Sequence, residues 1–595
     1  MREELLALRR AMAEAGVDVY IVPTDDFHGS EYTGAYFHCR AWLTGFTGSA
    51  GTAVVTKDWA GLWTDGRYFL QAADQLAGSG FTLMKQREKG VPEIPEWLEK
   101  NLEEGMVLGF DGRSMTSGNG KRYTAVAEKK GATVRFDLDL VGLCWAGRPP
   151  MSEAPVWALP EENAGRSRSE KIAALRAAIK KEGADAHLLC SLDDLAWLLN
   201  IRGDDVPCCP VVLADAYITD EAFILFIDER KFSPALRSAL EAEGICFRPY
   251  LSLYDFLPTV PAGTKLLLSP DKANYAILKG LPAGVTVLEK EDPTLIPKAA
   301  KNPAEQDGER LAHIKDGAAL TRFMKWLREH VGREPITEIS AAKKLLEFRA
   351  EMPGFLGESF DPIMGYGPHG AIVHYKAEPE TDAALQAEGF FLCDTGGHYR
   401  EGTTDVTRTF VLGPITEEMK YHYTLVLKGH LGLGAAVFPR GICGLQIDYA
   451  ARRPLWEAGL NYNHGTGHGV GHILNVHEGP QRINSNYQKA RTEGEIFLPG
   501  MVTSDEPGLY FEGKYGIRLE NLMLCVEKQK TDFGSFLGFE MLTMCPFERE
   551  AILPELLSEA ERKALNDYHE TVYKKLSPYY NEEERLWLKE ACAPI

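Results

Sequence analysis

The sequence lacks the features of a membrane-spanning or exported chain. No stretch of its 595 residues approaches the roughly 18 consecutive apolar residues that a transmembrane helix needs. Charges occur throughout residues 1–16, which read MREELLALRRAMAEAG and contain no apolar segment. We therefore expect no signal peptide and no membrane contact, and interpret these residues as an amphipathic helix that starts the fold.

Cysteines are few and irregularly spaced. The chain has 11 of them, an odd number, and no two stand at the C-x-x-C spacing of zinc and redox motifs. Cys208 and Cys209 are adjacent, which is an awkward arrangement for a zinc site. We expect free thiols in a reducing compartment, which favours the cytoplasm.

Positive charge is in deficit. Lys and Arg total 65 against 85 Asp and Glu, a formal net charge of −20. Proteins that bind nucleic-acid duplexes need basic surface to displace counterions, so this balance argues against a nucleic-acid partner. The hydrophobic fraction of 45% and the charged fraction of 25% are ordinary for a globular protein. The length suggests roughly four domains.

The first half of the chain contains a faint internal repeat. Residues 5–26 read as a helix, a strand and an acidic turn, and residues 171–194 repeat that order. A Trp-Leu pair and a further strand follow in both places. We predict two related α/β domains, at 1–155 and 156–300, with four prolines between residues 149 and 160 marking the linker. A chance match of helix–strand patterns is the alternative.

A third region begins near residue 301. The segment 301–327 predicts a long amphipathic helix, with an apolar stripe formed by Leu311, Ile314, Ala318 and residues 320–323. Beyond Phe355 the composition shifts toward Gly, His and Asp. We predict a domain at 301–550 and a charged helical extension at 551–595.

Histidines concentrate in one segment. Four of the 15 lie within residues 464–479, which read HGTGHGVGHILNVHEG. His464 and His468 stand four apart, but the interspersed glycines make a helix improbable and no Glu follows the first His, so this is not a zincin motif. The glycines indicate an extended segment whose backbone passes close to another group. A loop without a ligand role is the alternative.

Acidic residues flank this segment on both sides. Asp394 and Asp405 lie in residues 390–413, where a strand–turn–strand pattern would bring them together. Like charges at close range are costly unless a cation lies between them. Two acids in a hairpin are, taken alone, more often solvated turn residues.

Two further acids follow the histidines. Glu506 precedes a Pro-Gly turn, and Glu520 lies in the strand pattern GIRLENLMLCVE, where alternation places it on one face with Arg518. An Arg518–Glu520 ion pair is the alternative to a ligand role. Together, four carboxylates and one imidazole could neutralise two divalent cations, and such an oxygen-rich set suits Mn, Mg or Co, with Zn and Fe as borderline cases.

With these residues in place, the chain resembles the aminopeptidase P family, in its three-domain cytosolic form, over essentially its whole length. The resemblance is carried by DTGGHYREGTTDVTRT, HGTGHGVG, SDEPGLY and GIRLENL, and supported by TGFTGSAG, TDGRYFLQA, GAIVHY and FLGFEMLTMCP. The departures are small: GGHYRE lies between the aspartates, and a few residues are inserted between His468 and Glu506. The fold class implied is α/β plus α+β, with two creatinase-like N-terminal α/β domains and a pita-bread catalytic domain built on a curved antiparallel sheet.

The resemblance implies a dinuclear metal centre. Asp394 would chelate one ion, Asp405 and Glu520 would bridge both, and His468 and Glu506 would hold the other. The ions would usually be Mn²⁺, with Zn²⁺, Co²⁺ or Fe²⁺ as alternatives.

The implied reaction is hydrolysis of the N-terminal Xaa-Pro bond of peptides. This bond is a tertiary amide without an N–H, and the proline ring fixes φ, so most peptidases stall there. A hydroxide bridging two metals could attack the carbonyl directly. Glu506 would transfer a proton to the proline nitrogen. His374 and His477 would stabilise the carbonyl oxygen and the intermediate, and His464 would help to bind the proline side.

Other features are implied less sharply. Arg518 would orient a carboxylate, whereas His398 and His472 have no assigned role and count as structural. A homodimer is implied by resemblance alone. Arg67 in TDGRYFLQA is either structural or directed to a site in the partner subunit.

Two alternatives stay open. Prolidase, a dipeptidase with the same metal ligands, lacks the second α/β domain, so the 300 residues before the catalytic region argue against it. A non-catalytic pita-bread module that binds proteins would characteristically lose metal ligands, whereas this sequence keeps all five. The native metal, the preferred first residue and the physiological peptide do not follow from the sequence.

Overall fold

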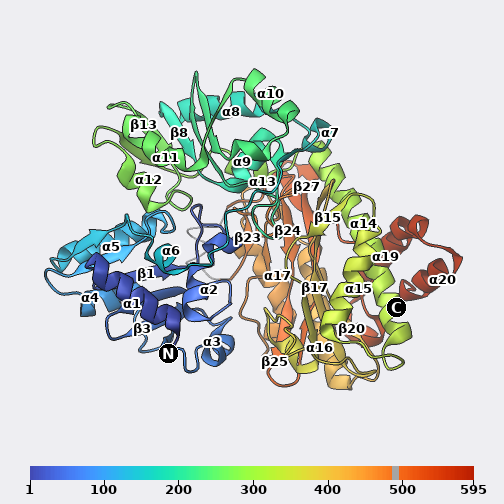
Figure 1. The fold of residues 1–595 in the computed structure, drawn as a ribbon. Coiled ribbons are helices and arrows are strands. Elements are labelled where there is room, and N and C mark those ends of the chain that lie inside the picture. Colours follow the sequence, from blue (N-terminus) through green and yellow to red (C-terminus); the bar gives the residue numbers. More distant parts are fainter. Residues whose placement is uncertain (486–494) are drawn as a thin grey trace. The chain divides into compact units, whose positions relative to one another are not determined.

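The structure, a computed structural model, describes residues 1–485 and 495–595 (Figure 1). The chain forms two compact units: Met1–Leu159 with Ser167–Thr294, and Pro160–Arg166 with Leu295–Ile595. All 11 cysteines lie in the described part and are free thiols, as expected. No helix within those residues is both long and apolar enough to cross a membrane.

The first unit opens with a six-stranded sheet of order β4-β3-β2-β1-β5-β6. Its strands are β1 (Val19–Pro23), β2 (Thr52–Thr56), β3 (Ala60–Thr64), β4 (Thr82–Lys85), β5 (Val107–Phe110) and β6 (Thr133–Arg135). Every residue of β1 is buried. Alternate residues of β1 pack with α1 (Glu3–Ala15) on one face and with α4 (Ile94–Asn101) and α5 (Ser117–Lys129) on the other.

A second six-stranded sheet in the same unit repeats this topology, in the order β12-β11-β10-β8-β13-β14. Its strands are β8 (Ala186–Leu189), β10 (Ala214–Thr219), β11 (Phe223–Ile227), β12 (Ile245–Arg248), β13 (Lys265–Leu268) and β14 (Thr286–Glu289). The central strand β8 pairs antiparallel with β10 and parallel with β13, just as β1 pairs with β2 and β5. The paired α/β fold predicted from the sequence repeat is confirmed.

The second unit combines long helices with antiparallel strands. Its main helices are α14 (Pro303–His330), α15 (Glu338–Ala350), α16 (Glu417–Gly434), α17 (Gly444–Glu457), α19 (Glu559–Leu576) and α20 (Glu582–Ala591). Its two larger sheets have the orders β16-β17-β20 and β21-β28-β27-β24. Their strands are β16 (Ile363–Tyr366), β17 (Phe390–Thr395), β20 (Val406–Val411), β21 (Val437–Pro439), β24 (Val502–Asp505), β27 (Asn521–Thr531) and β28 (Gly534–Met541). The predicted α+β character of this half is confirmed.

The hairpin predicted for residues 390–413 is present. β17 and β20 pair antiparallel, with Asp394 opposite Thr407, and Asp405 lies immediately before β20. The intervening GGHYRE residues form part of a small hairpin of β18 (Gly397–Tyr399) and β19 (Gly402–Thr403). The extra residues expected between His468 and Glu506 include 486–494, which lie outside the described residues.

Two local predictions were wrong. The pattern GIRLENL does not form one strand, because β26 (Tyr515–Arg518) ends before Leu519 and β27 begins at Asn521. Arg518 and Glu520 therefore do not share a strand face. The reason is that the backbone N–H of Glu520 donates to the carbonyl of Thr407 on β20, which draws the chain from one pairing to the next.

The other correction concerns α14. The helix spans the expected segment, and Ala318, Leu320 and Phe323 are buried as predicted. In its first half, however, Leu311 is 38% exposed, and the buried positions include Glu305, Glu309, His313 and Asp316. This face is polar because polar groups of other segments cover it and satisfy its hydrogen bonds.

Candidate functional site

The centre of the site lies in the second unit, where three segments meet. Asp405 precedes β20, His468 lies in the short strand β22 (Gly467–His468), and Glu520 lies between β26 and β27. Each offers a ligand atom, and these atoms lie within 4.8 Å of one another. Thr407 Oγ1 donates to Glu520 Oε2 at 2.7 Å, which fixes that carboxylate beside the hairpin.

Glu506 joins this group from the end of β24. The Nε2 atom of His468 lies 3.5 Å from Asp405 Oδ2 and 3.5 Å from Glu506 Oε1. Ser504 links the two segments, because its hydroxyl accepts from the backbone N–H of His468 at 2.9 Å and donates to Glu506 Oε1 at 3.1 Å. Sequence reasoning missed Ser504, although it stands inside the SDEPGLY motif.

Asp394 approaches from β17. Arg518 Nη2 donates to Asp394 Oδ2 at 2.6 Å, so this arginine does pair with a carboxylate, as expected. The Oδ1 atom of Asp394 is buried and accepts no hydrogen bond from the described residues. One oxygen of this carboxylate is thus left for a ligand from outside the chain.

Burial and mutual repulsion disfavour the ionised forms of the acids in this site. Burial and the charges of Asp405 and Glu506 raise the pKa of Glu520 well above its usual value. Burial also raises the pKa of Glu506, against the charge of His468. Burial disfavours the cationic form of His468, but its hydrogen bond to Asp405 and the charge of Glu506 raise its pKa to about 9. A positive charge in the site would relieve this repulsion.

His464 is held at the edge of the same site. Its Nε2 lies 2.8 Å from the Tyr510 hydroxyl, and its backbone carbonyl accepts from Arg452 Nη2 at 2.8 Å. Burial and the charge of Arg518 lower the pKa of His464 to about 3, so the ring is neutral. Arg518 Nη1 also donates to the Tyr510 hydroxyl at 2.7 Å. Tyr510, in β25 (Gly508–Phe511), was not predicted from the sequence.

The other two histidines predicted from the sequence lie near this centre. The ring of His477 packs edge-on against that of His468, with centroids 4.4 Å apart. His374 is exposed, and its neighbour Val373 has a carbonyl that accepts from Arg518 Nη2 at 3.4 Å. His374 also contributes to lowering the pKa of His464, after burial, Arg518 and Arg452. All eight predicted positions, including the four acids and His468, therefore gather around one centre.

The loop that carries His374 is anchored by a carboxylate that sequence reasoning missed. Glu338, the first residue of α15, is 0% exposed. It accepts hydrogen bonds from four groups of that loop and its surroundings: Tyr366 N at 2.7 Å, His369 Nδ1 at 2.8 Å, the Tyr375 hydroxyl at 2.8 Å and Ala383 N at 3.0 Å. The sequence signal that could have found it is an acid in the first turn of a helix, because Glu338 begins α15.

Comparison with known proteins agrees with this geometry. Residues 308–527 match the family model described as "Metallopeptidase family M24", and residues 535–595 match "C-terminal region of peptidase_M24". A "Probable Xaa-Pro aminopeptidase P" of Coprinopsis cinerea is 41% identical over 622 residues, covering 100% of this chain and 98% of the relative. The chain belongs to metallopeptidase family M24. Residues 5–138 and 147–305 each match a "Creatinase/Prolidase N-terminal domain".

Solved structures agree with the M24 assignment. The chain is similar to an X-prolyl aminopeptidase of Caenorhabditis elegans, described as a cytosolic enzyme with a di-nuclear active site. The TM-score is 0.93 at 36% identity, with 100% of this chain and 99% of that chain covered. An Xaa-Pro dipeptidase of Bacillus anthracis matches with a TM-score of 0.52 at 24% identity, which shows the fold alone and covers 64% of this chain.

The residues present fit the metal that an M24 metallopeptidase implies. The buried Asp394 Oδ1 lacks a partner among the described residues, and the pKa values of Glu506 and Glu520 are raised by burial and by neighbouring acids. Oxygen donors with one imidazole are the ligands that divalent first-row ions take in proteins. Asp394, Asp405, His468, Glu506 and Glu520 could together hold such ions.

Three other residues singled out from the sequence have described contacts with residues outside the predicted ligand set. His398 is buried, with Nδ1 3.0 Å from Thr403 Oγ1. His472 is buried, with Nδ1 2.8 Å from Glu309 Oε1. Arg67 lies in the first unit, where it is exposed and donates to Asp65 at 2.8 Å.

Proposed function

We propose that this chain is a metal-dependent aminopeptidase that releases the first residue of peptides with proline in second position. The observation that carries the proposal is the convergence of Asp405, His468 and Glu520 within 4.8 Å. It occurs in a chain 41% identical, over its full length, to a relative named Xaa-Pro aminopeptidase P.

Two divalent ions would be held by Asp394, Asp405, His468, Glu506 and Glu520, and the di-nuclear site of the nematode structure supports this number. When bound, the ions would polarise the scissile carbonyl and lower the pKa of water enough to supply a nucleophile at neutral pH. We propose Mn²⁺ as the ion, because four of the five ligands are carboxylates.

The remaining roles fall to the chain's own side chains. Glu506 would receive a proton at its carboxylate and deliver it to the departing proline nitrogen. His374 and His477 would donate hydrogen bonds to the carbonyl oxygen as it becomes negative. His464, held by Tyr510, would contact the proline side of the peptide. Their positions around Asp405 and His468 support these assignments.

A prolidase is the nearest alternative. The Bacillus anthracis dipeptidase covers only 64% of this chain while being covered over 99% of its own length. The present chain carries two α/β sheets before the second unit. This additional domain favours the aminopeptidase reading, as does the full-length match to relatives with that name.

We further propose domains at 1–155, 156–300 and 301–550, with 551–595 as a helical extension. The matched regions 5–138, 147–305 and 308–527 support a division into three domains. A cytoplasmic location is supported by the description of the nematode enzyme as cytosolic. A homodimer is proposed from the family resemblance.

The test measures release of the first residue from Xaa-Pro dipeptides, Xaa-Pro-Pro tripeptides and longer peptides, with metal content determined on the same sample. We expect hydrolysis of tripeptides and longer peptides, loss of activity on chelation and recovery with Mn²⁺. Cleavage of dipeptides alone would indicate a prolidase. Absence of both bound metal and activity would indicate a binding module.

A further inference from the structure

The first turns of α14 direct ionisable side chains into the interior of the second unit. Glu305, Glu309, His313 and Asp316 recur at the three- and four-residue spacing of one helical face, and all are buried. Charged side chains are rarely buried without specific partners, because desolvation is costly. We therefore expect these four side chains to have specific polar partners in other segments of the second unit.

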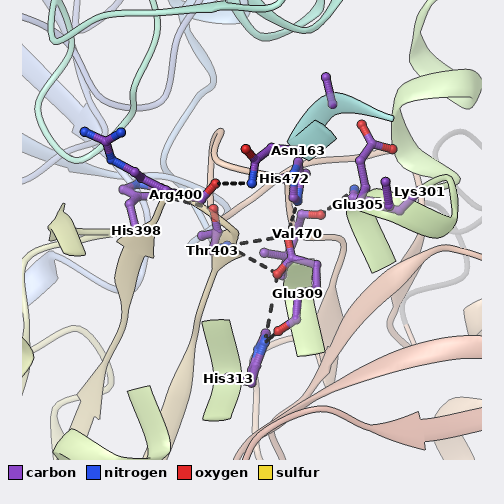
Figure 2. Close-up of polar contacts among 12 residues, drawn as sticks. Asn163, Lys301, Glu305, Glu309, His313, His398, Arg400, Thr403, Val470 and His472 are labelled. Carbon is purple, nitrogen blue, oxygen red and sulfur yellow. Dashed lines mark hydrogen bonds and ion pairs between the residues drawn. The ribbon is translucent and has the colours of Figure 1, made fainter. Parts of the chain in front are cut away.

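Glu309 has partners from two separate segments (Figure 2). Its Oε1 lies 2.8 Å from Nδ1 of His472, and its Oε2 accepts from the backbone N–H of Thr403 at 3.2 Å. Glu309 is 1% exposed, so water does not compete for these contacts. A single carboxylate thus holds the histidine segment and the β19 strand at a set separation.

Both segments carry ligands of the proposed metal centre. Thr403 stands two residues before Asp405, and His472 stands four residues after His468. Neither ligand touches Glu309 in any contact described for it, so its influence passes through the backbone of the two segments. A shift of either segment would change the distance between Asp405 and His468.

The approach of α14 to this region leaves no spare room. A Cβ atom added at Gly308 would lie 2.3 Å from the carbonyl oxygen of Glu401, and one added at Gly402 would lie 2.6 Å from Glu309 Oε2. Glycine on both surfaces lets the helix backbone and the β19 strand come into direct contact. The contacts of Glu309 with Thr403 and His472 therefore depend on this close packing of α14 against the β19 strand.

A second set of contacts holds the far end of the histidine segment. Lys301 Nζ donates to the carbonyl of Val470 at 2.6 Å (Figure 2). It also donates to Glu478 Oε1 at 2.9 Å. Lys298 pairs with the other oxygen of Glu478 at 2.8 Å. Residues 470–478 are thus tied, on both sides of His472, to residues that precede α14, and Glu309 connects this segment to Thr403.

We propose that Glu309 is a positioning residue that holds Asp405 and His468 at the separation required for metal binding, and so sets the affinity of the site for divalent ions. This inference rests on the proposed function, because it presupposes the metal centre. Glu309 acts through Thr403 and His472 and does not itself contact metal or substrate.

Two variants of Glu309 distinguish the effect of its side-chain length from the effect of its charge. Glu309→Asp keeps the carboxylate but shortens the side chain by one carbon–carbon bond, about 1.5 Å, so it cannot contact both partners. Glu309→Gln loses the charge but keeps an oxygen for Thr403 and an N–H₂ group for His472. Burial raises the pKa of Glu309 well above its usual value, and its neutral form is nearly isosteric with Gln.

The experiment titrates the metal-free chain with Mn²⁺ by calorimetry, alongside its thermal midpoint by circular dichroism. We expect Glu309→Asp to bind Mn²⁺ about 10- to 100-fold more weakly, the usual effect of losing an outer-sphere contact, and Glu309→Gln to bind within about threefold of the original chain. His472→Leu should resemble Glu309→Asp, whereas His472→Asn, which keeps a donor near the Nδ1 position, should recover most of the affinity.

Glu548→Gln is the matched control. Glu548 is a buried carboxylate paired with Arg328 at the other end of α14, so this variant should lose stability without losing Mn²⁺ affinity. Unchanged Mn²⁺ affinity in folded Glu309→Asp, or strong loss in Glu309→Gln alone, would overturn the positioning role. If Glu309→Asp does not fold, the two His472 variants decide by the same criterion. An original chain that bound no divalent ion would overturn the proposed function as well.

Discussion

Two fully buried strands, one in each unit, differ in what they bury. β1 in the first unit reads VYIVP, and its one polar side-chain group is the Tyr20 hydroxyl, which donates to the carbonyl of Leu138 at 2.6 Å. β17 in the second unit reads FFLCDT and ends in the buried Asp394 and Thr395. Its neighbour β20 reads VTRTFV and buries Thr407, Arg408 and Thr409.

The two kinds of strand differ in how specific their packing partners must be. An apolar strand is stabilised by any well-packed hydrophobic surface, since the hydrophobic effect has no direction. Each buried polar group instead needs a particular partner, because leaving it unpaired costs about 1–3 kcal/mol. In β17 and β20 those partners include Arg518, Glu520 and Asn521, so the polar strands define where distant segments must converge.

Removing an acid from the polar strand region should affect activity most. Asp405→Ala should lower kcat/KM at least about 10³-fold, the scale of losing a principal catalytic group. The stability of the metal-free variant should change little, because it loses both the repulsion between Asp405 and Glu520 and the hydrogen bond between Asp405 and His468. Steady-state kinetics and urea unfolding measure the two effects. More than a tenth of the original activity would contradict the assignment of Asp405.

Removing a buried acid from the first unit should do the opposite. Asp205 Oδ2 lies 2.7 Å from Lys231 Nζ, and both residues are buried. Asp205→Asn leaves a buried unpaired cation and should destabilise the first unit by about 3–5 kcal/mol. Activity per folded molecule should stay unchanged. A large loss of kcat with unchanged stability would mean that the first unit takes part in the chemistry.

Glu338→Ala tests whether a buried carboxylate affects activity by holding the loop that carries His374. Without its four hydrogen bonds, the loop that carries His374 should shift, and a displacement near 1 Å can cost about 10²-fold in rate. We expect kcat/KM to fall by about 10- to 100-fold, with Glu338→Gln intermediate because it keeps one acceptor oxygen. If kcat/KM of both variants equalled that of the original chain, the anchoring role of Glu338 would be contradicted.

Tyr510→Phe should have a smaller effect. It removes the hydroxyl that accepts from Arg518 and contacts His464, a hydrogen bond to a charged group worth about 1.5 kcal/mol. We expect about a tenfold loss of kcat/KM and little change in thermal midpoint. Phe511→Leu, on the same strand, is a control that leaves both hydrogen bonds intact.

The pH dependence of the metal-free chain gives the smallest effect. The raised pKa of Glu520 means that the folded state holds its proton more tightly, so its contribution to stability is present below the unfolded value of 4.5 and lost as pH rises. The pKa of His468, raised to about 9, likewise contributes stability below its unfolded value of 6.5 that is lost as pH rises through 9.

Thermal midpoints of the chelated chain should therefore fall between about pH 5 and pH 9, and Mn²⁺ should reduce that fall. Mn²⁺ stabilises the ionised carboxylates, which removes the reason for the raised pKa values. A chelated chain that is equally stable throughout this range would contradict the prediction.

Much of the fold and most of the site were predictable from contiguous residues. The helix–strand repeat in the first half corresponds to two sheets of one topology, and the pairing of β17 with β20 brings Asp394 and Asp405 to one site. The Gly-rich histidine segment is not helical, as its composition indicates. These features depend on side-chain periodicity and turn residues, which act over a few positions along the chain.

What was missed depends on contacts between distant segments. Leu311 and Ile314 fit an apolar stripe, yet the first half of α14 buries Glu305 and Glu309 instead. Glu309 meets His472, 163 residues away, and the carboxylate that Arg518 orients, which the sequence left unnamed, is Asp394, 124 residues away. Helical periodicity shows which side chains share a face of α14. Whether that face is buried under apolar or polar groups depends on the segments that cover it, because hydrogen-bond partners of a buried carboxylate are supplied by the folded chain and not by its sequence neighbours.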